Sequence, residues 1–253
     1  MKEREGLLAG KVALITGASR GIGKATALIF AENGAKMAIH GRDQVLLEDL
    51  AREIRKRKND CLIVKGDLTL PDIPHMIIKE TVQYFGEIDI LVNNAGIIRR
   101  EKFEEMTLEQ WEEVLKLNLT AAMKCCQAVL PYMKEKNFGK IVNVSSNAAK
   151  RSYLGAALSY GASKAALLNL TRNLAKAYAP FGIYINAICP GQTETEMCAD
   201  WSLEFRKQQT EQIPLGRLGK PEEIGKAILF LCSDLSDFVV GETLVVNGGS
   251  FMD

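Results

Sequence analysis

Short apolar runs rich in β-branched residues alternate along the chain with stretches of helical periodicity. The runs are nearly continuously apolar, as strands buried on both faces of a sheet must be, and they cover residues 12–16, 37–40, 62–64, 88–92, 141–144, 183–188 and 244–246. Within residues 43–58, Leu47, Leu50 and Ile54 share one helical face behind Asp43, a residue type that caps helix N-termini. The pattern therefore predicts strands separated by amphipathic helices.

A further helix is indicated near the C-terminus. Pro221 suits a first helical turn, and Ile224, Ile228 and Leu231 form one apolar stripe within residues 221–233. Strands that alternate with helices form parallel βαβ units, so the chain is expected to have an α/β fold with a doubly wound parallel sheet of about seven strands. No linker, low-complexity tract or repeat divides residues 1–253, and we expect a single domain.

The composition is that of an ordinary globular protein. Hydrophobic residues make up 47% and charged residues 25% of the 253 residues, close to the average for soluble domains. The formal net charge is +1, whereas a nucleic-acid binder usually shows a basic excess or a basic stripe. We therefore expect a small-molecule substrate and no nucleic-acid partner.

Cysteine and histidine spacing gives no sign of a metal site. The six cysteines include no C-x-x-C pair, and His40 and His75 are isolated. Reduced, mostly buried thiols are typical of cytoplasmic proteins. The N-terminus lacks the apolar segment of a signal peptide, and no run of about 18 apolar residues could cross a membrane. The sequence predicts a cytoplasmic chain with no metal and no membrane association.

The first predicted strand runs directly into a glycine-rich turn at residues 16–23, Thr-Gly-Ala-Ser-Arg-Gly-Ile-Gly, before a helical pattern begins. Glycines let the backbone turn sharply and approach a ligand, and the helix N-terminus offers unpaired N–H groups to a pyrophosphate. The spacing is G-x-x-x-G-x-G, not the G-x-G-x-x-G of the common dinucleotide fingerprint. On this turn alone, a tight strand–helix connection is the alternative to a cofactor site.

The end of the second strand bears on which nicotinamide cofactor would bind. NAD-binding sites place an acidic residue there to hold the ribose 2′-hydroxyl, whereas a nearby Arg accommodates the 2′-phosphate of NADP. Here Gly41 and Arg42 follow His40, no acid is present at the strand end, and Arg20 lies in the glycine turn. The residues predict NADP(H), with two solvated arginines as the alternative.

Tyr160 and Lys164 lie four residues apart, so on a helix they share a face. The pKa of a phenol is about 10, and a nearby cation lowers it, which favours proton exchange at neutral pH. The pair suits a general acid for a carbonyl oxygen. Taken alone, an ordinary surface Tyr and Lys is the alternative.

Together with further motifs, these residues resemble the short-chain dehydrogenase/reductase (SDR) family over nearly the whole chain. The other similar segments are Asp67-Leu68, Asn93-Asn94-Ala95-Gly96, Asn118 in a Leu-Asn-Leu context, Ser145-Ser146, Pro190-Gly191-Gln-Thr193-Glu-Thr195, Arg217-Leu-Gly-Lys-Pro-Glu-Glu-Ile and Val246-Asn247-Gly248-Gly249, where the family has Asp in place of Asn247. The resemblance implies a Rossmann fold and an oxidoreductase that acts on CH–OH donors with NAD(P) as acceptor.

The resemblance also implies a role for each catalytic side chain. Tyr160 gives a proton to the carbonyl oxygen, Ser146 hydrogen-bonds that oxygen, and Lys164 holds the nicotinamide ribose and lowers the pKa of Tyr160. Asn118 holds a water that links Lys164 to solvent. Fourteen residues separate Ser146 from Tyr160, one more than the family usually has, so an insertion is expected in this loop and Ser145 is the alternative to Ser146.

The implied cofactor is NADP(H), and its binding residues follow from the same motifs. They are Gly17, Ser19, Arg20, Gly21, Ile22, Gly23, Arg42, Asp67, Leu68, Asn94, Ala95, Gly96, Tyr160, Lys164, Pro190, Gly191, Thr193 and Thr195. Position 193 is Thr where the family usually has Ile or Val, which changes little if its backbone makes the contact.

Four cations near the expected pocket suggest an anionic substrate, namely Arg99, Arg100, Lys150 and Arg151. The segment Asn-Ala-Gly-Ile-Ile-Arg-Arg-Glu at 94–101 resembles SDR enzymes that act on sugar acids of the gluconate type. The rest of the chain also resembles 3-oxoacyl-(acyl-carrier-protein) reductases, which are the alternative. The cations could instead be solvated or paired with Glu101 and Glu104, since exposed ion pairs decide little.

Three expectations concern activity, specificity and assembly. A cofactor-binding protein without turnover is a further alternative, but the presence of all four catalytic residues argues against it. The family uses residues 192–212 as a mobile substrate lid, and Trp201 and Phe205 lie there, with simple packing as the alternative. The family also implies a homotetramer, and residues 111–133 and 159–178 carry more apolar positions than one buried stripe needs.

Overall fold

A computed structural model describes residues 6–151, 158–199 and 201–252, and within them the seven predicted strands form one parallel sheet. The strand order is β3-β2-β1-β4-β5-β6-β7, so the predicted doubly wound α/β fold is confirmed. The strands are β1 Val12–Ile15, β2 Lys36–Gly41, β3 Cys61–Lys65, β4 Ile90–Asn93, β5 Gly139–Val144, β6 Ile183–Pro190 and β7 Thr243–Val246. All six strand pairings are parallel.

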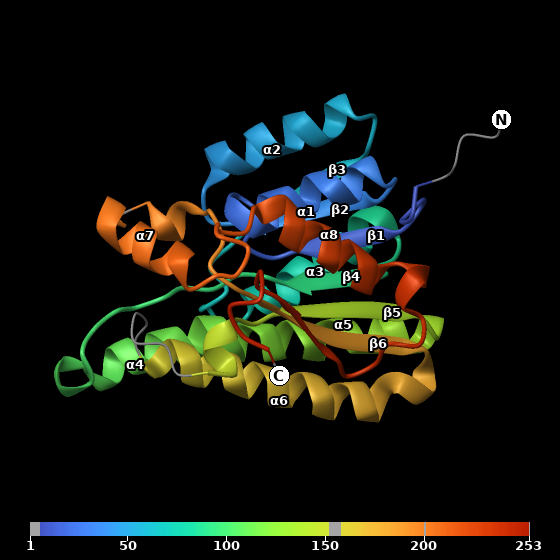
Figure 1. Ribbon diagram of the computed structural model, residues 1–253. Coiled ribbons are helices and arrows are strands. Elements are labelled where there is room, and N and C mark those ends of the chain that lie inside the picture. Colours follow the sequence, from blue (N-terminus) through green and yellow to red (C-terminus); the bar gives the residue numbers. More distant parts are fainter. Residues whose placement is uncertain (1–5, 152–157, 200, 253) are drawn as a thin grey trace.

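Helices cover both faces of the sheet (Figure 1). They are α1 Gly21–Glu32, α2 Gln44–Lys56, α3 Ile73–Phe85, α4 Leu108–Leu115, α5 Ala121–Lys136, α6 Leu158–Tyr178, α7 Leu203–Glu211 and α8 Pro221–Cys232. A π-helical turn at Lys116–Thr120 joins α4 to α5. Asp43 caps α2 as predicted, because its Oδ1 accepts a hydrogen bond from Leu46 N at 3.2 Å.

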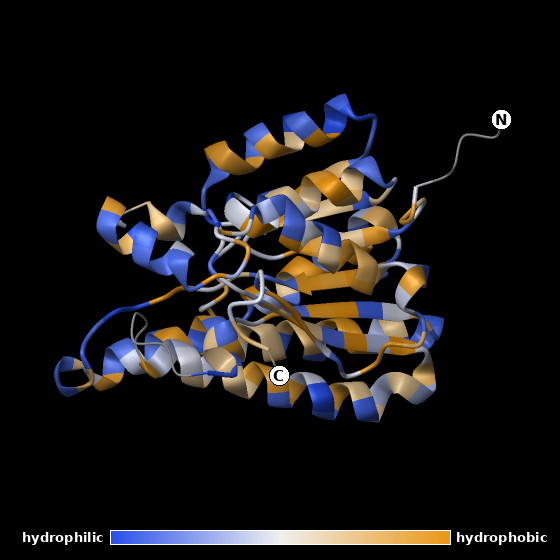
Figure 2. Cartoon of the chain, in the orientation of Figure 1, coloured by the Kyte–Doolittle hydropathy of each residue, from blue (hydrophilic) through white to orange (hydrophobic). Residues whose placement is uncertain are grey.

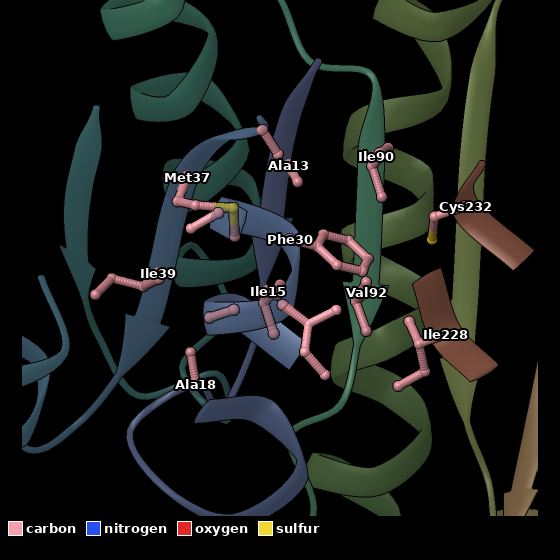
Figure 3. Close-up of a cluster of buried hydrophobic side chains, with 14 of the residues drawn as sticks. Ala13, Ile15, Ala18, Phe30, Met37, Ile39, Ile90, Val92, Ile228 and Cys232 are labelled. Atoms are coloured by element: carbon pink, nitrogen blue, oxygen red, sulfur yellow. The ribbon is translucent and has the colours of Figure 1, made fainter. Parts of the chain in front are cut away.

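Two apolar clusters sandwich the sheet. On one face, α1, α2 and α8 pack against alternate residues of the central strands, and Figure 3 shows the ring of Phe30 among side chains from β1 and β4, with Ile228 of α8 nearby. On the other face, α3, α5 and α6 bury the intervening strand residues, including Leu14 and Ile141. The strands are accordingly apolar along most of their length, whereas the outer side of α2 is hydrophilic (Figure 2).

The strand ends differ from the sequence prediction by one or two residues. The fourth strand begins at Ile90 and not at Ile88. The residue before it, Asp89, still hydrogen-bonds to both neighbouring strands through its backbone, to Val12 O at 3.0 Å and from Lys140 N at 2.9 Å. Its buried carboxylate also accepts a hydrogen bond from Val12 N at 2.9 Å, so Asp89 joins the start of β4 to β1.

The strand order places a binding crevice at one edge of the sheet. The strand order reverses at β1, which has β2 as its neighbour on one side and β4 on the other. In open α/β sheets, ligands bind outside the carboxyl ends of the strands at such a switch point. The glycine-rich turn after β1 and the loops after β4, β5 and β6 all leave the sheet at this edge.

Candidate active site

A cavity of about 830 Å³ lies at the carboxyl edge of the sheet and brings together most of the predicted site residues. Those that line it are Gly17, Ser19, Arg20, Gly21, Ile22, Arg42, Asp67, Leu68, Asn94, Ala95, Gly96, Arg100, Ser146, Arg151, Tyr160, Lys164, Pro190, Gly191, Thr193 and Thr195. Gly23, Asn118, Arg99 and Lys150 are not among the lining residues.

The glycine-rich turn forms a cradle that side chains would fill. Gly17 and Gly21 have φ of 64° and 53°, in the left-handed region that favours glycine. Gly23 is buried, and a Cβ added to it would lie 2.3 Å from the carbonyl oxygen of Gly17. Among the described residues, no side chain caps the N-terminus of α1. Its N–H groups and positive dipole are therefore suited to a pyrophosphate.

Hydrogen bonds tie this turn to the loop after β4. The Thr16 hydroxyl oxygen accepts from Asn94 N at 3.0 Å and from Ala95 N at 3.1 Å. In return, Asn94 Nδ2 donates to the carbonyls of Thr16 and Gly17, each at 3.0 Å. Thr16 is buried, and this role was not predicted from the sequence. The bonds hold two cofactor-facing loops in a fixed relation.

The far end of the cavity has the features expected of an adenine and 2′-phosphate site. Asp67 Oδ1 accepts hydrogen bonds from Thr69 N and Thr69 Oγ1, which lower the pKa of Asp67 and keep it ionised. Arg42 and Arg20 both line the cavity and are exposed. Burial lowers the pKa of His40 to about 4, so this imidazole is neutral at physiological pH and contributes no charge to the site.

At the opposite end, Ser146, Tyr160 and Lys164 meet. Ser146 lies two residues after the end of β5, and its hydroxyl is hydrogen-bonded to that of Tyr160 on α6. Lys164 Nζ lies 5.9 Å from the centre of the Tyr160 ring and donates to the carbonyl of Val144 at 2.7 Å. The alternative serine, Ser145, donates its hydroxyl to the Lys164 carbonyl at 2.9 Å. The geometry therefore favours Ser146 as the serine that faces a substrate.

Burial shifts the pKa of both Tyr160 and Lys164. Burial raises the pKa of Tyr160, and this effect outweighs the hydrogen bond from Ser146 that lowers it. The Lys164 ammonium is buried and donates to Val144 O, and that it lowers the pKa of Tyr160 stays a prediction. Burial lowers the pKa of Lys164 to about 8. Tyr160 is thus protonated at neutral pH and competent as an acid.

Asn118 lies in the π-helical turn and fastens the loop after β4. Its Oδ1 accepts from Ile97 N at 2.8 Å, and its Nδ2 donates to Ile97 O at 2.9 Å and to Ser163 Oγ at 3.2 Å. Both amide hydrogens are thereby used, and Oδ1 keeps one acceptor site. A Cβ added to Gly96 would lie 3.1 Å from this Oδ1 and 3.4 Å from Lys164 Nζ. The glycine therefore leaves space between the two groups that the predicted water requires.

The structure divides the four predicted substrate cations. Arg100 and Arg151 line the cavity, whereas Lys150 and Arg99 do not. Arg99 Nη2 pairs with Glu113 Oε2 at 2.5 Å, on an exposed part of α4. Arg99 is therefore held away from the cavity by a partner that its sequence neighbours did not reveal.

The predicted lid segment contributes residues that the sequence did not single out as binding residues. Trp201 lines the cavity and packs edge-on against Phe205 of α7, with ring centres 5.1 Å apart. Gln192 and Cys198 also line it. An insertion was predicted between Ser146 and Tyr160, and residues 152–157 of that loop lie outside those that the structure describes.

Two absences apply to the part of the chain that the structure covers. Its residues contain no cluster of three or more metal-ligating side chains. None of its helices is long and apolar enough to span a membrane. All six cysteines are free, and five of them are buried.

Comparisons with known proteins show that the chain is similar to reductases over nearly its whole length. A family model described as enoyl-(acyl carrier protein) reductase matches residues 17–250. The chain is 40% identical over 248 residues to a 3-oxoacyl-(acyl-carrier-protein) reductase from Aquifex aeolicus, which covers 96% of this chain and 98% of the relative.

Solved structures show the same similarity. A short-chain type dehydrogenase/reductase from Mycobacterium marinum is 34% identical and matches with a TM-score of 0.93 over 97% of both chains. A candidate gluconate dehydrogenase from Agrobacterium tumefaciens, also 34% identical, matches with a TM-score of 0.90 over 96% of both chains.

Proposed function

Because the chain belongs to the short-chain dehydrogenase/reductase family and is an oxidoreductase acting on CH–OH groups, we propose that it is NADP(H)-dependent and acts on a small polar anion, such as a sugar acid. It would exchange hydride between the nicotinamide and the carbonyl or secondary alcohol of this substrate. The observation that carries the choice of substrate is the presence of two guanidinium groups, Arg100 and Arg151, in the wall of the catalytic cavity.

The chain's own residues divide the chemical work. A bound nicotinamide supplies the hydride chemistry. Tyr160 Oη holds the proton that a carbonyl oxygen receives, and the Ser146 hydroxyl, hydrogen-bonded to it, stabilises the charge that develops on that oxygen. Lys164 would bind the nicotinamide ribose, and Asn118 would hold the water that returns a proton. Because Lys164 is buried, the field of its ammonium is weakly screened.

The preference for NADP(H) is supported by the end of β2. The strand closes with Gly41, where an acidic residue would otherwise contact the ribose 2′-hydroxyl, and the Asp43 carboxylate is engaged in capping α2. Arg42 and Arg20 offer donor groups at the cavity wall. A guanidinium binds phosphate with paired hydrogen bonds, so this end of the cavity suits a 2′-phosphate.

A second candidate function is the reduction of a 3-oxoacyl thioester on an acyl carrier protein. It is favoured by the relatives that carry this name at 37–40% identity and by a solved structure of that name from Brucella melitensis, 33% identical with a TM-score of 0.92. The two candidates differ in substrate size and charge. A panel of sugar acids, polyols and acyl thioesters, assayed with both nicotinamide cofactors, separates them directly.

Arg100→Ala should raise the KM for a sugar-acid substrate by roughly ten- to a hundredfold relative to the KM for a neutral diketone. A hydrogen bond to a charged group contributes about 1.5–3 kcal/mol, and 1.4 kcal/mol corresponds to a factor of ten. Arg99→Ala is the matched control, because Arg99 pairs with Glu113 outside the cavity and should leave both constants nearly unchanged. Equal effects of Arg100→Ala on the two substrates would refute the anionic substrate and favour the thioester.

We further propose that the chain forms a homotetramer, with support from a different surface than the sequence suggested. Of the apolar positions in the two long helical segments, several are buried within the chain itself, for example Val114, Val129 and Leu167. Met123 and Tyr132 of α5 are each 36% exposed, whereas the apolar side chains between α8 and β7 are exposed further, with Phe238 fully exposed and Leu235 61% exposed. This segment adjoins the edge strand β7. An edge strand has unpaired backbone groups, and a second copy of the chain can cover them across a twofold axis.

Light scattering at micromolar concentration should therefore give about four chain masses. Phe238→Glu should lower the measured mass, because a charge would be buried at the subunit contact. Val45→Glu, which changes an exposed apolar residue on α2, is the control and should leave the mass unchanged. A monomer mass for the unmodified protein would rule out the assembly.

A further inference from the structure

The last residues of the chain fold back sharply after β7, and Asn247 closes this turn at both ends. Gly248 and Gly249 have φ of 64° and 86°, which glycine adopts without strain. Asn247 Oδ1 accepts a hydrogen bond from Gly249 N at 2.9 Å, and its Nδ2 donates to the carbonyl of Phe251 at 2.7 Å. The same Nδ2 lies 3.5 Å from Asn147 Oδ1 in the loop after β5.

The turn presents Ser250 to the loop that follows the catalytic serine. Asn147 Nδ2 donates to Ser250 Oγ at 3.2 Å, and Arg151 Nη1 donates to the Ser250 carbonyl at 2.7 Å. Both Asn147 and Arg151 line the catalytic cavity. Because the acceptor for Arg151 is a main-chain carbonyl, its position depends on the shape of the turn and not on the serine side chain.

Close packing fixes Asn247 on its other sides. A Cβ added to Gly191, which lines the cavity, would lie 2.8 Å from Asn247 Cβ. On the far side of the turn, Leu215 N donates to the Gly248 carbonyl at 3.3 Å. The turn therefore lies between the cavity wall and the segment that follows α7, and it packs so closely that position 191 has no room for a side chain.

We propose that Asn247 is a positioning residue for the substrate pocket: its amide fastens residues 247–251 so that Ser250 holds Arg151 at the cavity wall. This inference rests on the proposed function, in which Arg151 recognises an anionic substrate. Asp, which the family has at this position, is the same size and could still accept from Gly249, but it has no hydrogen to donate to Phe251, so the bond from Nδ2 to the Phe251 carbonyl is specific to a chain with Asn here. The donor of the amide is therefore the feature on which the fastening depends.

The kinetic test uses Asn247→Asp, with Arg151→Ala as the reference for a lost guanidinium and Ser250→Ala as the control. NADPH is the reductant, ketogluconate the anionic probe and diacetyl the neutral probe. Asn247→Asp should raise the ratio of KM for ketogluconate to KM for diacetyl by about tenfold, in the same direction as Arg151→Ala. Ser250→Ala retains the carbonyl that Arg151 contacts and removes only the hydroxyl that contacts Asn147, so it should change this ratio by less than about twofold.

Hydrogen exchange of Asn247→Asp decides the structural half of the proposal independently of the substrate. Exchange should accelerate in residues 248–251 and also in residues 147–151, while the amides of β1 stay protected. Unchanged exchange at 147–151, or a ratio that changes in Arg151→Ala but not in Asn247→Asp, overturns the proposal. If exchange accelerates as expected but both variants affect ketogluconate and diacetyl equally, the fastening stands and the anionic substrate is wrong.

Discussion

Replacing Tyr160 with phenylalanine should lower kcat by at least about a hundredfold, the lower end of the usual contribution of general acid catalysis. Phenylalanine keeps the ring and its packing but removes the hydroxyl that is hydrogen-bonded to Ser146. Because burial raises the pKa of Tyr160, the phenol carries its proton throughout the neutral range. Lys164 Nζ is directed to Val144 O and does not take its place.

NADPH binding, followed by nicotinamide fluorescence, should be nearly unchanged in this variant, because the cofactor contacts of the glycine turn are intact. Tyr178→Phe is a matched control: it removes a hydroxyl from the other end of α6, where the ring packs against Phe181 and outside the cavity. Its kcat should equal that of the unmodified protein. Near-normal turnover in Tyr160→Phe would show that another group donates the proton.

Arg42→Ala should weaken NADPH binding by roughly ten- to a hundredfold, since a hydrogen bond to a charged group contributes about 1.5–3 kcal/mol. The residue follows Gly41 at the end of β2 and lines the cavity next to the Asp67 site. The effect should diminish with added salt, because Arg42 is exposed and its field is screened.

NADH is the internal control for this variant, because it lacks the 2′-phosphate and should bind the altered protein as well as it binds the original. Arg52→Ala is a second control, since Arg52 lies on the exposed face of α2 and pairs with Asp49. Equal losses of affinity for NADPH and NADH in Arg42→Ala would mean that Arg42 shapes the site without contacting the phosphate, and the NADP(H) assignment would fail.

Much of the fold could be predicted because its signals are local. Nearly continuous apolar runs identify strands buried on both faces. The two ends of each run lie within two residues of the ends of the observed strand. Asp43 and Pro221 mark helix starts through capping and backbone preference, which depend only on neighbouring residues. The order of the glycine turn and later loops along the chain also implies that they share one edge of the sheet.

Features set by contacts distant in sequence could not be predicted. Arg99 and Arg100 are adjacent, yet only Arg100 reaches the cavity, because Glu113 on α4 holds Arg99 outside. The pKa of Tyr160 depends on how deeply the folded chain buries it, and spacing to Lys164 says nothing of that. The link between the C-terminal turn and Arg151 spans about a hundred residues and leaves no periodic pattern in the sequence.

Some site contacts had a partial signal. Thr16 opens the glycine turn and was part of that motif, but the sequence does not show that its hydroxyl accepts from two N–H groups of the next loop. The π-helical turn around Asn118 is another case, since its residues have unremarkable helix preferences. Such turns frequently accompany functional sites, and this one directs Asn118 to Ile97.

The most direct test of the central claim is the initial rate of absorbance loss at the nicotinamide band when the protein is mixed with ketogluconate, with NADPH and NADH compared at equal concentration. An NADP(H)-dependent reductase of a small anionic carbonyl should consume NADPH, and do so at least about tenfold faster than NADH at subsaturating cofactor. An equal rate with NADH, or no consumption of NADPH with ketogluconate while a 3-oxoacyl thioester is reduced, would contradict the account.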